Sequence, residues 1–99
     1  MSKIYVIMVD FAFSGEPNRV SIEGVYDDKE MAQLMFKQMV ENLKAIDKNN
    51  GYDSFEEDET SYNGWLDGEY NWYHSTLTLG EYELNKTNVL MKDGTSKWL

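Results

Sequence analysis

Carboxylates are the side chains in this chain best suited to do chemistry. The sequence has 99 residues with 18 Asp plus Glu, no cysteine and one histidine, His74. Thiol catalysis and thiolate zinc sites need cysteine, and paired-histidine sites need a second histidine, so these classes are excluded. The remaining chemistry is that of carboxylates, which can bind a metal, transfer protons or attract a basic partner.

The segment Asp47–Glu57 has the residue types of a calcium loop. An EF-hand loop places oxygen ligands at its first, third and fifth positions and a bidentate Glu at its twelfth. Asp47 and Asn49 match the first two ligands, but Glu57 matches only if one residue is deleted, and Asp53 then falls at an apolar position. A calcium module using Asp47, Asn49, Asp53 and Glu57 is one hypothesis. The competing interpretation is a helix end followed by an acidic loop.

Catalytic chemistry has little support in the pattern. A catalytic histidine needs a partner carboxylate and a nucleophile, and nothing designates either for His74, so we interpret it as a partly buried strand residue. The run Glu56–Glu59 could supply an acid–base pair, but adjacent loop carboxylates are usually solvated. We therefore expect a protein that is not an enzyme and that uses no metal or cofactor.

All of the excess negative charge lies in one part of the chain. The formal charge is −9, and between Asn49 and Asn85 there are nine acidic residues and no Lys or Arg. The remaining residues carry nine acids and nine bases. The same segment contains eight of the fourteen aromatic residues. Disordered acidic tails are poor in aromatics, so this composition indicates an ordered surface.

An acidic and aromatic surface favours binding to a basic surface on a protein partner. Closely spaced carboxylates imitate nucleic-acid phosphates and steer a basic groove toward them, while aromatic rings supply the central contacts. We expect no direct contact with nucleic acid, because the charge has the wrong sign. The residues assigned to this surface are Asp53, Glu56, Glu57, Asp58, Glu59, Tyr62 and Trp65. The alternative is an acidic loop that is merely solvated.

Two hairpin-forming strands are predicted at the start of the chain. Residues 3–14 are apolar on both faces at first, which is typical of a central strand covered on both sides. Residues 15–18 form a turn, and Arg19–Tyr26 follows as a strand with Val20, Ile22 and Tyr26 on one side.

A long amphipathic helix is predicted next. Asp27 and Glu30 form a capping-box pattern at its start, and residues 49–51 end it. Its apolar stripe consists of Ala32, Phe36, Met39, Leu43 and Ile46, flanked by Met35 and Val40.

The remaining pattern predicts a loop and then strands. Residues 51–69 are interpreted as a long ordered loop or a short irregular hairpin, and residues 70–84 as a long strand. The apolar phase of that strand changes at Gly80, which predicts a bulge there. Residues 87–91 are predicted as a short last strand.

These elements predict one α+β domain spanning residues 1–99, of β-β-α-β order, with one long amphipathic helix packed on an antiparallel sheet. The apolar stretch near the start is too short for a membrane span or a signal peptide, so we expect a cytoplasmic protein that does not bind membranes. A terminal strand and the apolar end Trp98-Leu99 can either close the sheet or pair with a second copy, so a homo-oligomer is one alternative.

Three stretches also carry a family resemblance: Lys3–Ile7, Gly24–Ala32 and Gly80–Leu84. In this order of strand, capped helix and late strand, the chain resembles small uncharacterised phage and mobile-element proteins of β-β-α-β type. The resemblance implies no known activity and no catalytic residue. It does imply a setting in which small acidic proteins bind and block a host enzyme, so the favoured hypothesis becomes an inhibitor that occupies a basic nucleic-acid-binding surface.

Overall fold

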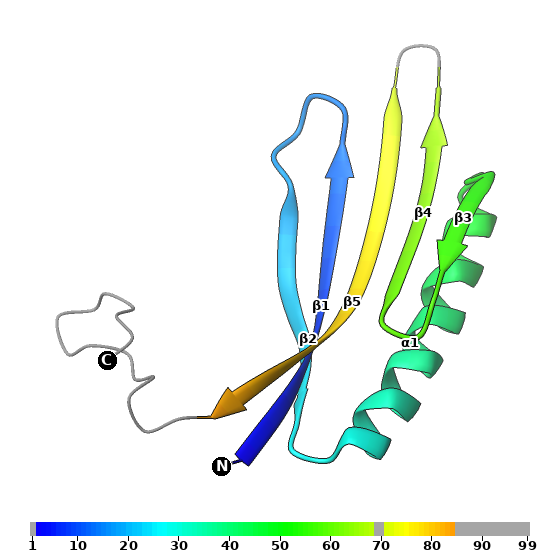
Figure 1. The fold of residues 1–99 in the computed structure, drawn as a ribbon. Coiled ribbons are helices and arrows are strands. Elements are labelled where there is room, and N and C mark those ends of the chain that lie inside the picture. The colour runs from blue at the N-terminus through cyan, green and yellow to red at the C-terminus, as the bar shows by residue number, and fades with distance from the viewer. Residues whose placement is uncertain (1, 69–70, 85–99) are drawn as a thin grey trace, which may run out of the picture.

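The computed structural model describes residues 2–68 and 71–84, which form one antiparallel sheet and one helix (Figure 1). The elements are β1 Ser2–Phe13, β2 Arg19–Tyr26, α1 Lys29–Asn49, β3 Ser54–Glu57, β4 Ser61–Asp67 and β5 Trp72–Leu84. The strands lie in the order β2-β1-β5-β4-β3. The predicted α+β class, with a helix on an antiparallel sheet, is confirmed.

The segment between the helix and the last described strand is a regular hairpin. The sequence predicted a loop or an irregular hairpin here, but β3 pairs with β4, and β4 pairs with β5 along its whole length. The turn between β3 and β4 is held by Asp58, whose Oδ1 accepts the backbone N–H groups of Thr60 and Ser61, both at 2.8 Å. This hairpin makes the order β-β-α-β-β-β.

Helix α1 starts one residue later than predicted. Asp28 is the N-cap, and its Oδ1 accepts the Glu30 N–H at 3.0 Å. The buried stripe consists of Ala32, Phe36, Val40 and Asp47, whereas the predicted core residue Ile46 is 56% exposed. The helix ends at Asn49 with Asn50 as its C-cap, within the predicted stop at residues 49–51.

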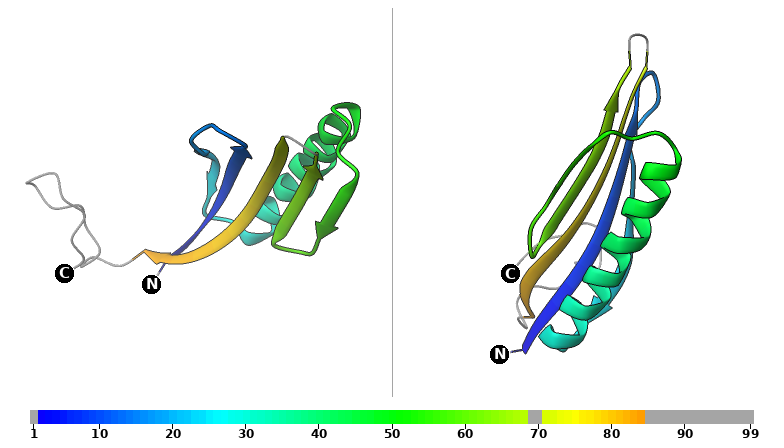
Figure 2. Two further views of the ribbon diagram at one scale, coloured as in Figure 1. Left: turned by 90° about the horizontal axis from the view of Figure 1, so that it is seen from above. Right: turned by 90° about the vertical axis from the view of Figure 1, so that its right-hand side faces the viewer.

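Helix α1 covers one face of the sheet, and the core lies between them (Figure 2). The buried cluster consists of Ile7, Val9, Phe36, Val40, Tyr62 and Leu77. Within residues 2–68 and 71–84, no element covers the opposite face, which we call the open face. Ile4, Val6 and Met8 of β1 therefore stay half-buried there, although the sequence predicted a strand covered on both sides.

The bulge lies in β2, not at Gly80. The pairing of β1 with β5 is continuous from Ser2↔Leu84 to Phe13↔Tyr73, so the predicted bulge is wrong. In β2, Ile22 pairs with Met8 and Gly24 with Ile7, which leaves Glu23 as the extra residue.

The bulge also separates residues that the sequence placed together. Tyr26 is paired with Tyr5 on the helix-covered face, whereas Val20 and Ile22 lie on the open face.

The predicted strand 87–91 and the end Trp98-Leu99 lie outside the described residues. In the described part of the chain, α1 is too polar to cross a membrane.

Candidate functional site

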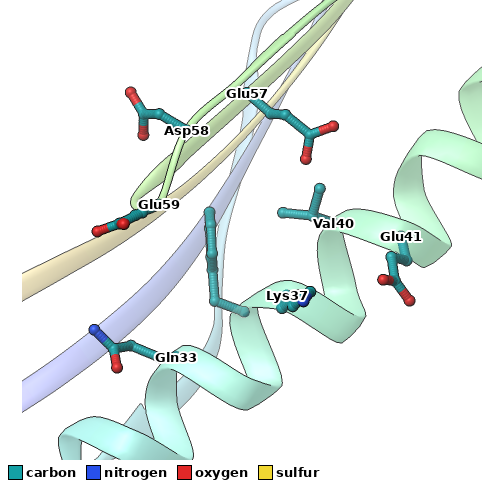
Figure 3. Close-up of a pocket in the computed structure, with 8 residues that line it drawn as sticks. Gln33, Lys37, Val40, Glu41, Glu57, Asp58 and Glu59 are labelled. Carbon is teal, nitrogen blue, oxygen red and sulfur yellow. The ribbon is translucent and has the colours of Figure 1, made fainter.

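A cleft of about 520 Å³ lies between α1 and the β3–β4 turn (Figure 3). We call it the acidic cleft. Its lining residues are Gln33, Phe36, Lys37, Val40, Glu41, Glu57, Asp58 and Glu59. Phe36 and Val40 are almost fully buried and form an apolar wall on α1, while the carboxylates stand at the rim. The cleft therefore combines an apolar surface with an excess of negative charge.

Four carboxylates and one ammonium group line the acidic cleft. Glu41 comes from α1 and the other three from the end of β3 and its turn, while Lys37 is the cation. Figure 3 shows Glu57 pointing toward α1 and Asp58 pointing away from it. Just outside the lining, Lys44 Nζ lies 2.7 Å from Glu57 Oε1 and offsets part of that charge. Glu41 and Glu59 remain the lining carboxylates best placed to receive a cation.

Asp58 contributes negative charge to the cleft and also has a structural role. Its carboxylate accepts the N–H groups of Thr60 and Ser61 and closes the turn between β3 and β4. The hydrogen bond from the Thr60 backbone, with further ones from Ser61 and the Thr60 hydroxyl, holds the pKa of Asp58 below its usual value. Asp58 thus stays ionised in neutral solution and fixes the position of its neighbours.

The structure divides the predicted binding surface. Glu57, Asp58 and Glu59 meet at the acidic cleft, but Asp53 precedes β3 at its far end. Glu56 pairs with Asn63 and lies on the open face, because neighbouring residues of a strand point to opposite faces.

Neither predicted aromatic contact lies at the acidic cleft. Tyr62 has no exposed surface, so its assignment to a binding surface is wrong: its ring fills the core under α1. Trp65 is half-buried on the open face, where its ring meets that of His74 edge-on at a centroid distance of 6.1 Å.

Asp47, the first residue of the calcium-like segment, is buried inside the protein. It is 2% exposed and accepts hydrogen bonds from the Tyr62 hydroxyl at 2.7 Å and the Ser75 hydroxyl at 3.1 Å. We call these three residues the Asp47 network. Among residues 2–68 and 71–84, no three acidic or histidine side chains converge on a metal position. The structure therefore does not bring together the ligands of the calcium hypothesis.

Burial sets the titration of the Asp47 network. Burial raises the pKa of Asp47, against the smaller opposing effect of hydrogen bonds from Tyr62 and Ser75. Burial and the neighbouring Asp47 also raise the pKa of Tyr62. The groups of this buried cluster satisfy one another's hydrogen bonds, so the network stabilises the fold.

The Asp47→Asn variant should reveal this titration in the pH dependence of stability. Because the folded-state pKa of Asp47 is raised, its favourable contribution is complete below its ordinary pKa of 3.8 and declines as pH rises through the folded-state pKa. We expect the unfolding free energy of the wild type to fall relative to Asp47→Asn between acidic and neutral pH. Urea denaturation across that range measures the difference, and a constant difference would contradict the assignment.

His74 lies on the open face and not in the cleft. Its Nε2 is 3.2 Å from the Asn63 Oδ1, which also accepts a hydrogen bond from the Thr76 hydroxyl at 3.1 Å. In the described part of the chain, the side-chain contacts of His74 are with an amide and an indole ring.

Sequence reasoning missed the five members of the cleft that come from α1: Gln33, Phe36, Lys37, Val40 and Glu41. Phe36 and Val40 carried a signal as core residues of the amphipathic stripe, and the other three as polar residues of the opposite side. These residues come next to the β3–β4 turn only because the hairpin packs against this part of α1, and no local pattern encodes that packing.

No protein-family model, curated protein or solved structure matches this chain.

Proposed function

We propose that this chain is a non-catalytic interaction protein whose acidic cleft receives a basic side chain from a protein partner. The observation that carries the proposal is the joining of an apolar wall, Phe36 and Val40, to the carboxylates of Glu41, Asp58 and Glu59 in one cleft of about 520 Å³. Lysine and arginine have this same division, with an aliphatic stem below a cationic head.

The two parts of the cleft contribute in different ways. The apolar wall covers the stem of the entering side chain, and the rim carboxylates accept hydrogen bonds from its head. The surrounding net charge of −9 steers a basic protein toward the cleft and increases the rate of association at low salt. Lys44 lies just outside the lining and is paired with Glu57 at 2.7 Å, so one carboxylate of the cleft already contacts an ammonium group.

Among basic surfaces, a nucleic-acid-binding groove is the class we favour. Such grooves carry rows of Lys and Arg that match several carboxylates at once, and the carboxylates of Glu57, Asp58 and Glu59 meet at the acidic cleft. The phage-type resemblance points the same way, to a protein that blocks a host enzyme. Duplex DNA should then displace this protein from a partner captured in a host lysate, and DNA that fails to compete would limit the proposal to other basic surfaces.

A charge-neutralised variant tests the cleft itself. In Glu41→Gln/Glu57→Gln/Glu59→Gln we expect the affinity for a ten-residue arginine peptide to fall about tenfold, since each exposed ion pair contributes about 0.2–1 kcal/mol. Asp58 is left in place because it holds the turn. Isothermal titration calorimetry at two salt concentrations measures the affinity and its electrostatic part.

The matched control removes the same number of charges elsewhere. Glu16, Asp27 and Asp67 are exposed and lie outside the cleft lining, so Glu16→Gln/Asp27→Asn/Asp67→Asn changes only the overall charge. We expect it to weaken binding about twofold, because distant charges are screened. Equal losses in both variants would show non-specific attraction to an acidic protein and would overturn the proposal.

A further inference from the structure

Strand β2 is an edge strand with an apolar and accessible surface. It pairs with β1 on one side, and among residues 2–68 and 71–84 no strand pairs with its other side (Figure 1). Val20, Ile22 and Val25 are 57%, 60% and 57% exposed, which is unusual for three apolar residues of one strand. Lysine and proline, which commonly protect an edge from pairing, are absent from Arg19–Tyr26.

The charges of β2 are self-complementary. If two copies of β2 pair antiparallel with Ser21 opposite Ser21, then Arg19 of each copy lies opposite Glu23 of the other. Val20 then lies opposite Ile22, so that exposed apolar residues also meet across the junction. Directly opposite residues of antiparallel strands share a face, and pairs of opposite charge or of apolar side chains stabilise the pairing.

The rest of the fold permits this pairing. The acidic strand β3 lies at the other edge of the sheet, as far from β2 as the strand order allows. Joining two copies through β2 therefore places their acidic edges at the two ends of one continuous sheet, where their mutual repulsion is screened. The bulge at Glu23 bends the second half of β2, which limits the pairing to Arg19–Glu23.

We propose that β2 pairs with β2 of a second copy of this chain, antiparallel about Ser21, to form a two-fold symmetric dimer. The interface is isologous, because the same residues contribute from both copies. Five residues on each side make a small interface, so the dimer forms reversibly and its population rises with concentration. This proposal does not depend on the function proposed for the acidic cleft.

Disulfide trapping tests the register directly. The chain contains no cysteine, so Ser21→Cys introduces a single thiol at the two-fold axis, where opposite Cα atoms lie about 4.5–5.5 Å apart and can be bridged. We expect this variant to form a covalent dimer under mild oxidation. Val20→Cys is the matched control on the same exposed strand, because each Val20 faces Ile22 and lies too far from its own copy to be bridged.

Charge exchange tests the interface without a cross-link. Arg19→Glu and Glu23→Arg each place like charges opposite one another in a homodimer, and we expect the dimer dissociation constant to rise roughly tenfold in each. Mixing the two variants, or combining both changes in one chain, restores opposite charges and should restore the wild-type constant. Both residues are exposed, so unchanged melting temperatures serve as the check on folding.

Sedimentation equilibrium of the full chain over a wide concentration range provides the constants. A wild type that stays monomeric at the highest attainable concentration would overturn the proposal. Equal cross-linking of Ser21→Cys and Val20→Cys, or failure of the mixed variants to associate, would overturn the proposed register.

Discussion

Asp47→Ala should lower the free energy of unfolding by roughly 2–3 kcal/mol. The change removes the carboxylate that accepts two buried hydrogen bonds, so the hydroxyls of Tyr62 and Ser75 lose their acceptor. A hydrogen bond to a charged group contributes about 1.5–3 kcal/mol, and an unsatisfied buried hydroxyl costs about 1–3 kcal/mol. Urea denaturation at neutral pH, followed by circular dichroism, measures the effect.

Three opposing effects reduce the loss but do not reverse it, the first being the cost of burying the Asp47 carboxylate. Alanine has a helix propensity better than that of aspartate by less than about 0.7 kcal/mol. Removing a negative charge near the C-terminal end of α1 relieves an unfavourable dipole interaction of about 0.3–1 kcal/mol. Glu41→Ala is a matched control on the exposed side of the same helix, and we expect it to change stability by less than 0.5 kcal/mol in either direction. An Asp47→Ala variant as stable as this control would show that the network adds nothing to stability.

A double-mutant cycle with Tyr62→Phe separates the hydrogen bond from the rest of the change. Because Tyr62 and Asp47 are bonded at 2.7 Å, the two substitutions should be less than additive. Additive losses would mean that each side chain acts through packing alone.

The parts of the fold that were predicted are those encoded locally. Helix α1 follows from a four-three spacing of apolar residues, an Asp cap and an Asn-Gly end, all within one stretch. The first hairpin follows from two apolar strands around a turn at residues 15–18. The β3–β4 hairpin was predicted only as one of two alternatives, and as irregular, because Asn63, Gly64 and Asp67 weaken its alternation and its stability depends on pairing with β5.

The part of the candidate site that was predicted is likewise the part that the local sequence encodes. The acidic residues at the end of β3 and in its turn could be recognised by charge, and three of them line the cleft. Asp47 could not be recognised as a core residue, since its hydrogen-bond partners lie 15 and 28 positions away in the sequence. Near a helix end, next to Lys48 and Asn49, its local pattern is that of an exposed residue. Tyr62 was misassigned for the converse reason, because acidic neighbours surround a ring that packs inward.

Gly64→Ala should destabilise the protein by roughly 3 kcal/mol. Gly64 is buried in β4, and a β-carbon there would collide with the Tyr62 hydroxyl and lie 2.9 Å from the Asp47 Oδ2. Overpacking a dense interior costs about 1–3 kcal/mol, and separating Tyr62 from Asp47 costs about 1 kcal/mol more. A glycine inside a strand is ordinarily unfavourable, so its presence here is explained by the close approach of the network.

Gly80→Ala is the matched control for this substitution. A β-carbon at Gly80 would also meet a tyrosine, but that tyrosine is Tyr82, which is 51% exposed and can turn away into solvent. We therefore expect a change below about 1 kcal/mol at Gly80 and a threefold larger loss at Gly64. Combining Gly64→Ala with Tyr62→Phe removes the colliding hydroxyl, so thermal unfolding of the double variant should show a smaller loss than the sum of the two single changes. Equal losses at both glycines would show that the packing of Asp47 and Tyr62 against β4 does not select glycine at position 64.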